Sequence, residues 1–111
     1  MSYSIFTTHR FEKELKRLAK KFPSLRNEFA ELIAHIIANP EMGAFIGNNC
    51  YKVRLAIGSK GKGKSGGARV ITYLYIETET IYFLTIYDKG EKSGLKPNEL
   101  KEMIESLEMD S

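Results

Sequence analysis

The sequence predicts a compact α+β domain with the element order β-α-α-β-β-β-α. Three observations support it: apolar side chains recur at helical spacing before residue 40, at alternate positions from residue 51, and at helical spacing again after residue 96. We expect a mainly antiparallel four-stranded sheet, because the two apolar helical stripes of the N-terminal half need a sheet face to cover. With 111 residues the chain is expected to form one domain, residues 1–111.

The first third of the chain predicts one strand followed by two helices. Residues 4–7 alternate as a short strand, and Thr8 can then cap a helix through its side-chain oxygen. The apolar positions of that helix are spaced by four, three and four residues: Phe11, Leu15, Leu18 and Phe22. A second stripe of the same period begins at Leu25 and ends before Pro40. The short link between the two helices predicts a helical hairpin.

From residue 51 the apolar period changes to two, which predicts a β-meander. Residues 51–57 form a strand with Lys52 and Arg54 on one face and apolar side chains on the other. Residues 68–77 and 80–88 are rich in β-branched and aromatic side chains, and the short polar link between them predicts an antiparallel hairpin. A C-terminal helix of about three turns, with an acidic outer face, completes the chain.

Positive charge gathers in the middle of the chain. The formal net charge is +3, yet residues 42–76 hold six lysines and arginines and no carboxylate, while residues 77–111 hold four basic and nine acidic side chains. A segment of one sign creates a local field suited to a polyanion such as RNA. The plain alternative is a solvated basic hairpin without a ligand.

Composition makes several classes of protein and site improbable. The sequence has no apolar run long enough to span a bilayer and no secretory leader, so we expect a cytoplasmic protein that does not bind membranes. A single cysteine, Cys50, cannot form an internal disulfide, and no Cys/His cluster predicts a metal site. Without a histidine near it in the sequence, Cys50 is also a poor candidate for a thiol nucleophile. We therefore expect no metal and no cofactor.

Residues 58–65 match the phosphate-loop pattern GxxxxGK[ST] letter for letter. A phosphate loop leads directly into a helix, yet here Gly66 and Gly67 lead into a β-type run, so the match argues only weakly for a nucleoside triphosphatase. We predict a hairpin loop instead, whose glycines let the backbone approach a ligand closely. Three lysines of this loop are candidate contacts to RNA phosphates, the alternative being solvated loop residues: Lys60, Lys62 and Lys64.

Three cations of the meander are candidates for chemistry on RNA. Arg69 begins the strand that should pair with the strand of Lys52 and Arg54, so the three could converge on one phosphate. Fixed cations stabilise the extra negative charge of a pentacoordinate phosphorus, and a crowded lysine can exchange a proton. Lys89 could reach the same place from the end of the last strand. Tyr87 offers a ring on which a base could stack, although a tyrosine at a strand end is as often part of the core.

Three segments resemble the successive strand signatures of the RelE/HigB/ParE toxin superfamily: residues 51–55 (YKVRL), 63–71 (GKSGGARVI) and 86–92 (IYDKGEK). The helical hairpin, residues 39–43 and the C-terminal helix after Leu95 also fit its HigB-like branch. The resemblance covers nearly the whole chain, and the second segment is its most specific part. It implies a RelE-like fold, in which the N-terminal helical hairpin covers the sheet.

The resemblance also implies a function. Members of the RelE and HigB branches are toxins of bacterial type II toxin-antitoxin pairs that enter the ribosomal A site and cut mRNA. Their cleavage is metal-free, by attack of a ribose 2′-OH that leaves a 2′,3′-cyclic phosphate and a 5′-OH. By motif, Lys52 and Arg54 match the family's basic pair, one of which is a candidate base, and Arg69 matches its phosphate-clamping arginine. A small acidic antitoxin is implied as the partner, beside mRNA and the ribosome.

The chain departs from the family pattern near its last strand. Well-described members place an arginine or histidine, followed by an aromatic residue, near that strand and the C-terminal helix, where this chain offers Tyr87, Lys89 and Glu91. Lys89 is the expected general acid, with Glu91 or Tyr87 as alternatives. Two other functions stay open. One is a ParE-like toxin that inhibits gyrase, which the retained cations disfavour, and the other is a catalytically silent domain that binds RNA or the antitoxin.

Overall fold

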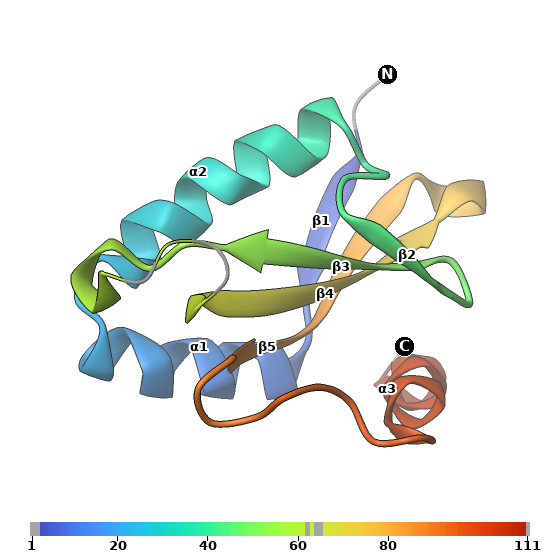
Figure 1. The fold of residues 1–111 in the computed structure, drawn as a ribbon. Helices are drawn as coiled ribbons and strands as arrows, with labels where there is room; N and C mark the ends of the chain where they lie inside the picture. Colours follow the sequence, from blue (N-terminus) through green and yellow to red (C-terminus); the bar gives the residue numbers. More distant parts are fainter. Residues whose placement is uncertain (1–2, 62, 64–65, 111) are drawn as a thin grey trace.

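The computed structural model describes residues 3–61, 63 and 66–110, without the side chains of 108–110. The elements follow one another as β1 (Ser4–Thr7), α1 (His9–Lys21), α2 (Leu25–Ala38), β2 (Ala44–Gly47), β3 (Cys50–Leu55), β4 (Ala68–Tyr75), β5 (Thr80–Asp88) and α3 (Glu99–Asp110) (Figure 1). Short 3-10 turns, η1 (Gly58–Lys60) and η3 (Ile76–Thr78), follow β3 and β4. The α+β class is confirmed.

The strands form one sheet in the order β1-β5-β4-β3-β2. β1 runs parallel to β5, and the other neighbours are antiparallel. The sheet has five strands rather than the expected four, because β2 folds back on β3 at an edge. Asn48 and Asn49 make that turn possible, with φ angles of 51° and 59° in the left-handed region that asparagine tolerates better than most residues. The four residues of β2 show no clear alternation in the sequence, so this edge strand was not predicted.

The helical hairpin covers one face of the sheet, as predicted. Thr8 caps α1, since its Oγ1 accepts a hydrogen bond from the Phe11 N–H at 3.1 Å. The apolar stripes of α1 and α2 meet the inward side chains of β3, β4 and β5, among which Val53, Val70 and Phe83 are fully buried. Burial of each such side chain contributes about 1.5 to 3 kcal/mol to the free energy of folding, so this layer is a major source of the stability of the sheet.

Helix α3 packs on the opposite face. Met103 is buried against Leu84, Ile71 and Tyr87, and Leu100 extends the same apolar contact. In Figure 1 α3 is seen end-on, apart from α1 and α2, at the end of the long connection that follows β5. The face under α3 is therefore only partly covered, and the rest of it carries the polar side chains described below. None of the helices in the described ranges has the length and apolar character needed to cross a membrane.

Candidate functional site

A row of polar side chains crosses three strands on the face of the sheet that α3 partly covers. Arg54 of β3 is the register partner of Arg69 of β4, and Arg69 is the partner of Tyr87 of β5. Their chain neighbours Val53 and Val70 belong to the core beneath the helical hairpin, so strand alternation turns the row to the opposite face. Directly opposed side chains have Cβ atoms about 4.5 to 5.5 Å apart. The row is therefore continuous, and we call Lys52, Arg54, Arg69 and Tyr87 together the cation row.

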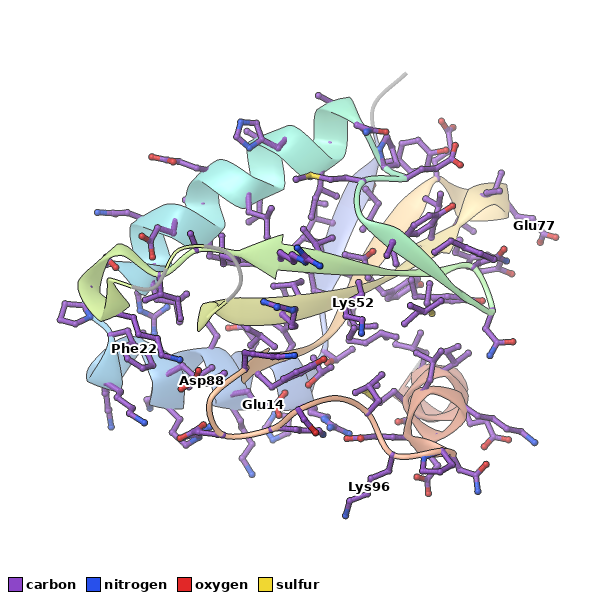
Figure 2. The ribbon with its side chains drawn as sticks, in the orientation of Figure 1. Glu14, Phe22, Lys52, Glu77, Asp88 and Lys96 are labelled. Atoms are coloured by element: carbon purple, nitrogen blue, oxygen red, sulfur yellow. The ribbon has the colours of Figure 1, made fainter. Side chains whose placement is uncertain are left out.

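Lys52 joins the row from the neighbouring position on β3. It lies two residues before Arg54, on the same face, and its register partner is Ile71. Figure 2 labels Lys52 in the space between the sheet and α3. The register thus brings the three meander cations of the sequence analysis to one face.

The row places like charges side by side. Opposed like charges destabilise a strand pair. In the described part of the chain Lys52 and Arg54 form no ion pair. Arg54 is exposed, whereas Arg69 is only 6% exposed and donates from Nη1 to the Ala68 carbonyl at 3.2 Å. A phosphate bound between the two guanidinium groups would offset their repulsion and accept charge-assisted hydrogen bonds from both.

Tyr87 closes the row but does not present an open ring. It is 4% exposed, it packs in the core beneath α3, and Lys92 Nζ lies 5.6 Å from its ring centroid. Its hydroxyl is buried without a hydrogen-bond partner among the described residues. Burial raises the pKa of this hydroxyl, and the nearby charge of Arg69 opposes that rise. The structure thus offers a neutral phenol at the end of the row, where the sequence predicted a surface for base stacking.

Lys60 lies in an ion pair rather than on a free loop. Its ammonium contacts the carboxylate of Asp88, and the two side chains are 14% and 3% exposed. Lys60 Nζ also lies 5.5 Å from the centroid of the Phe22 ring, and Figure 2 shows Asp88 beside Phe22. Burial by itself raises the pKa of the Asp88 carboxyl. The hydrogen bonds from Lys60 and from a backbone N–H outweigh burial, so the pKa lies below its ordinary value. The other loop lysines of the sequence analysis, Lys62 and Lys64, lie outside the described residues.

The predicted general acid, Lys89, lies beside the row. Its backbone N–H donates to the Gly67 carbonyl at 3.0 Å, which fixes residue 89 next to the beginning of β4, two residues from Arg69. The Lys89 side chain is exposed. The backbone of residue 89 is therefore close to the beginning of the strand that carries Arg69.

Glu91, the alternative proton carrier, is held on α1. Its carboxylate lies 2.8 Å from Arg17 Nη2 and 3.3 Å from Lys21 Nζ. The hydrogen bond from Arg17 has the largest effect on the pKa of Glu91 and lowers it. Burial raises the pKa, but the hydrogen bond from Lys21 also lowers it, and the result is a pKa of about 2. At neutral pH Glu91 is ionised and has no proton to donate.

A charged cluster that the sequence did not indicate fastens α3. Glu99 in its first turn accepts hydrogen bonds from Lys92 Nζ at 2.6 Å, from the Lys96 backbone N–H at 2.9 Å, and from the Arg10 guanidinium. Burial raises the pKa of Glu99, but these donors lower it to about 2. The cluster joins α1, the connection after β5 and α3, and it holds Lys92 over Tyr87. Arg10 is 89 positions from Glu99, so no local pattern could reveal that Arg10 belongs to the cluster.

Two other sequence features have a structural explanation. β4 begins at Ala68, where a phosphate loop would need a helix, and a Cβ added at Gly67 would lie 2.2 Å from the Leu55 carbonyl oxygen. The second glycine of that segment therefore allows two strands to approach. Cys50 is fully buried, and burial raises the pKa of its thiol to about 12, so it remains a protonated thiol. Among the described residues no group of three or more His, Cys, Asp or Glu side chains could hold a metal.

Comparison with known proteins supports one family. A family model described as the RelE toxin of the RelE / RelB toxin-antitoxin system matches residues 4–108. The solved structure of an arginine-to-alanine double mutant of E. coli toxin RelE in the free state is 17% identical, with a TM-score of 0.62 over 84% of this chain and 90% of that chain.

Two complexes are equally similar in fold. The E. coli RelBE toxin-antitoxin complex gives a TM-score of 0.60 at 17% identity, over 78% of this chain and 95% of that chain. The RelE mutant in complex with a peptide of the antitoxin RelB gives 0.61 at 16% identity, over 94% and 95%. At this level of identity the likeness shows that the chains share a fold.

Proposed function

The chain belongs to the RelE toxin family of toxin-antitoxin systems, and we propose that it is a ribosome-dependent endoribonuclease that cuts mRNA without a metal. The observation that carries this proposal is the cation row. Arg54 and Arg69 are opposed across β3 and β4, with Lys52 on the same face and Lys89 beside the end of the row. No acidic side chain belongs to the row, which is the arrangement expected for a site that binds and cleaves a polyanion.

In the proposed reaction the RNA itself supplies the nucleophile. A ribose 2′-oxygen attacks the adjacent phosphorus, the bond from phosphorus to the 5′-oxygen breaks, and the products are a 2′,3′-cyclic phosphate and a 5′-hydroxyl. Lys52 in its neutral form is the proposed acceptor of the 2′-OH proton, and Lys89 is the proposed donor of a proton to the leaving 5′-oxygen. Arg69 and Arg54 hold the phosphate and stabilise the charge that grows on its oxygens in the transition state.

The partners follow from the same proposal. mRNA and the ribosomal A site supply the polyanion, and Lys62 and Lys64 are proposed to contact its phosphates. Structures of E. coli RelE include complexes with the antitoxin RelB, and we propose that a small antitoxin likewise neutralises this chain. A nuclease that depends on ribosomes acts in the cytoplasm, which is the proposed location.

Mapping of mRNA 5′ ends after induction of the toxin tests the function. We expect discrete new ends within translated frames, absent when Arg69→Ala is expressed to the same level. Growth arrest without such ends, together with gyrase-dependent DNA breaks, would replace the proposal with the ParE-like function. If the folded protein causes neither growth arrest nor mRNA cleavage, the catalytically silent domain is favoured.

A further inference from the structure

We propose that Asp88 and Lys60 are positioning residues, whose ion pair holds the base of the loop after β3, residues 58–60, in place for RNA binding. This inference rests on the proposed function and deepens it. It separates Lys60 from the lysines that follow it, because it assigns Lys60 to the structure of the loop base and not to a phosphate. Three contacts at the base of the loop and the place of Asp88 in the sheet support this role.

The base of the loop is tied to the beginning of α2. The Gly58 N–H donates to Glu28 Oε2 at 2.7 Å, and the Ser59 N–H donates to Ser24 Oγ at 3.0 Å. Ser24 Oγ in turn donates to Glu28 Oε1 at 3.0 Å, so the two acceptors hold each other in place. The backbone amides of Gly58 and Ser59 are thereby both satisfied by side chains at the beginning of α2. We call these contacts and the ion pair of Lys60 with Asp88 the loop clamp.

The ion pair extends the clamp to the sheet. Lys60 follows directly on the two tied residues, and its ammonium lies over the Phe22 ring as it contacts Asp88. Asp88 is the last residue of β5 and the register partner of Ala68, one position away from the pairing of Tyr87 with Arg69. The clamp thus joins the loop base to the same sheet end that carries the cation row.

Asp88 and the cation row lie on opposite faces. Ala68, which pairs with Asp88, and Phe22, which lies beneath Lys60, both belong to the core under the helical hairpin, whereas Tyr87 belongs to the core under α3. Lys60 therefore cannot reach a phosphate on the row while it is paired. Any contribution of Lys60 to RNA binding must come from the loop position that it fixes.

Two variants distinguish a clamp from a direct phosphate contact, because the hypotheses predict opposite signs. If Lys60 were a phosphate ligand, Asp88→Asn would release it from its competing carboxylate, and RNA would bind more tightly. If the pair is a clamp, Asp88→Asn and Lys60→Met both weaken association, and the double variant is no worse than either single one. The matched control is Lys16→Met, an exposed lysine of α1 for which no change is expected.

The clamp can first be tested without RNA. Amide hydrogen exchange of Gly58 and Ser59 in the free protein should accelerate by about tenfold or more in Lys60→Met, while the slowest core amides exchange as in the parent. Glu28→Ala, at the exposed side of the clamp, should also accelerate the exchange of these amides. This variant serves as the test if Asp88→Asn does not fold. Unchanged exchange at both amides in the two variants would overturn the clamp, whether or not the parent cuts RNA.

The second measurement is cleavage on ribosomes programmed with a defined mRNA. We expect Lys60→Met to raise the apparent KM about tenfold with kcat nearly unchanged, since it disturbs association and not the reacting atoms. The exchanged pair, Lys60→Asp with Asp88→Lys, should recover part of the lost association. If the loss came only from a local packing defect, the exchange would not restore association. Tighter binding by Asp88→Asn, or an unchanged KM in Lys60→Met despite faster exchange, would overturn the positioning role.

Discussion

The cations of this protein divide into two groups that look alike in the sequence and differ in the fold. Lys52 and Arg54 of β3 form no ion pair within the described residues. Around the end of β5 and the beginning of α3, by contrast, three carboxylates are paired with cations. These pairs are Lys60 with Asp88, Arg17 and Lys21 with Glu91, and Arg10 and Lys92 with Glu99.

The difference shows that net charge along the chain does not identify which cations lack a carboxylate partner. The acidic C-terminal segment folds back and neutralises basic side chains of α1 and of the loop after β3. Lys52 and Arg54 are not paired in this way within the described residues, and α3 covers the neighbouring part of their face with apolar side chains. Strand register, and not the number of lysines, therefore defines the surface proposed to act on RNA.

The largest expected effect is that of Arg69→Ala. Because Arg69 is placed to stabilise charge that develops in the transition state, its loss should lower the cleavage rate at saturating ribosome concentration about 100- to 1,000-fold, while binding weakens far less. Single-turnover cleavage measures the rate and sedimentation with ribosomes measures binding. Arg26→Ala, on exposed α2 surface, is the control. Cleavage at the parental rate by bound Arg69→Ala would remove this residue from the mechanism.

Lys89 and Lys52 should differ in the proton that they move. Alanine at either position is expected to lower the rate about 100-fold, the usual scale for loss of a general acid or base. A substrate with sulfur in place of the bridging 5′-oxygen has a leaving group that needs no proton. It should restore the rate of Lys89→Ala and leave Lys52→Ala slow. Equal rescue of both variants, or of Tyr87→Phe alone, would reassign the general acid.

Lys62 and Lys64 should affect association alone. Their replacement by glutamine is expected to flatten the dependence of log K on log salt by about 0.7 to 1 per lost phosphate contact, with the bound-state cleavage rate unchanged. Ribosome binding measured over a range of salt concentrations tests this. A lower single-turnover rate at saturation would instead place a loop lysine at the reacting phosphate.

The smallest effect concerns the acid stability of α3. The pKa of Glu99 is lowered from 4.5 to about 2, so the stability it contributes is complete above 4.5 and is lost as pH falls toward 2. Glu99→Gln should remove that part of the pH dependence and accelerate amide exchange in α3 at neutral pH. Glu102→Gln, an exposed acidic change on the same helix, is the control. Identical acid unfolding of parent and Glu99→Gln would refute the assignment.

Local sequence patterns predicted the structural features that depend on residues close together in the sequence. The stripe of α1, the Thr8 cap and the alternation that places Lys52 and Arg54 on one face all depend on residues a few positions apart. The pairing of the first meander strand with the strand of Arg69 also followed, since consecutive strands in a meander are neighbours.

Long-range pairing could not be read from the sequence. In the sequence nothing distinguishes Lys60 from the neighbouring lysines. Its ion pair with Asp88, 28 positions away, forms only in the folded protein. From the sequence, the ring of Tyr87 was a candidate surface for base stacking. In the folded protein α3 and Lys92 cover this ring. Parallel addition of β1 to β5 and the attachment of α3 to α1 through Arg10 and Glu99 likewise depend on the finished packing.

One measurement tests the central claim, that the cation row is needed for the chemistry and the exposed cations of α1 are not. It compares single-turnover mRNA cleavage on programmed ribosomes by two triple alanine variants with the same change in net charge. One replaces Lys52, Arg54 and Arg69 in the cation row, and the other replaces the exposed α1 residues Lys13, Lys16 and Lys20. We predict background cleavage by the first variant and a near-parental rate for the second, both bound at saturation. Equal rates in the two variants, or substantial cleavage by the first, would contradict the account.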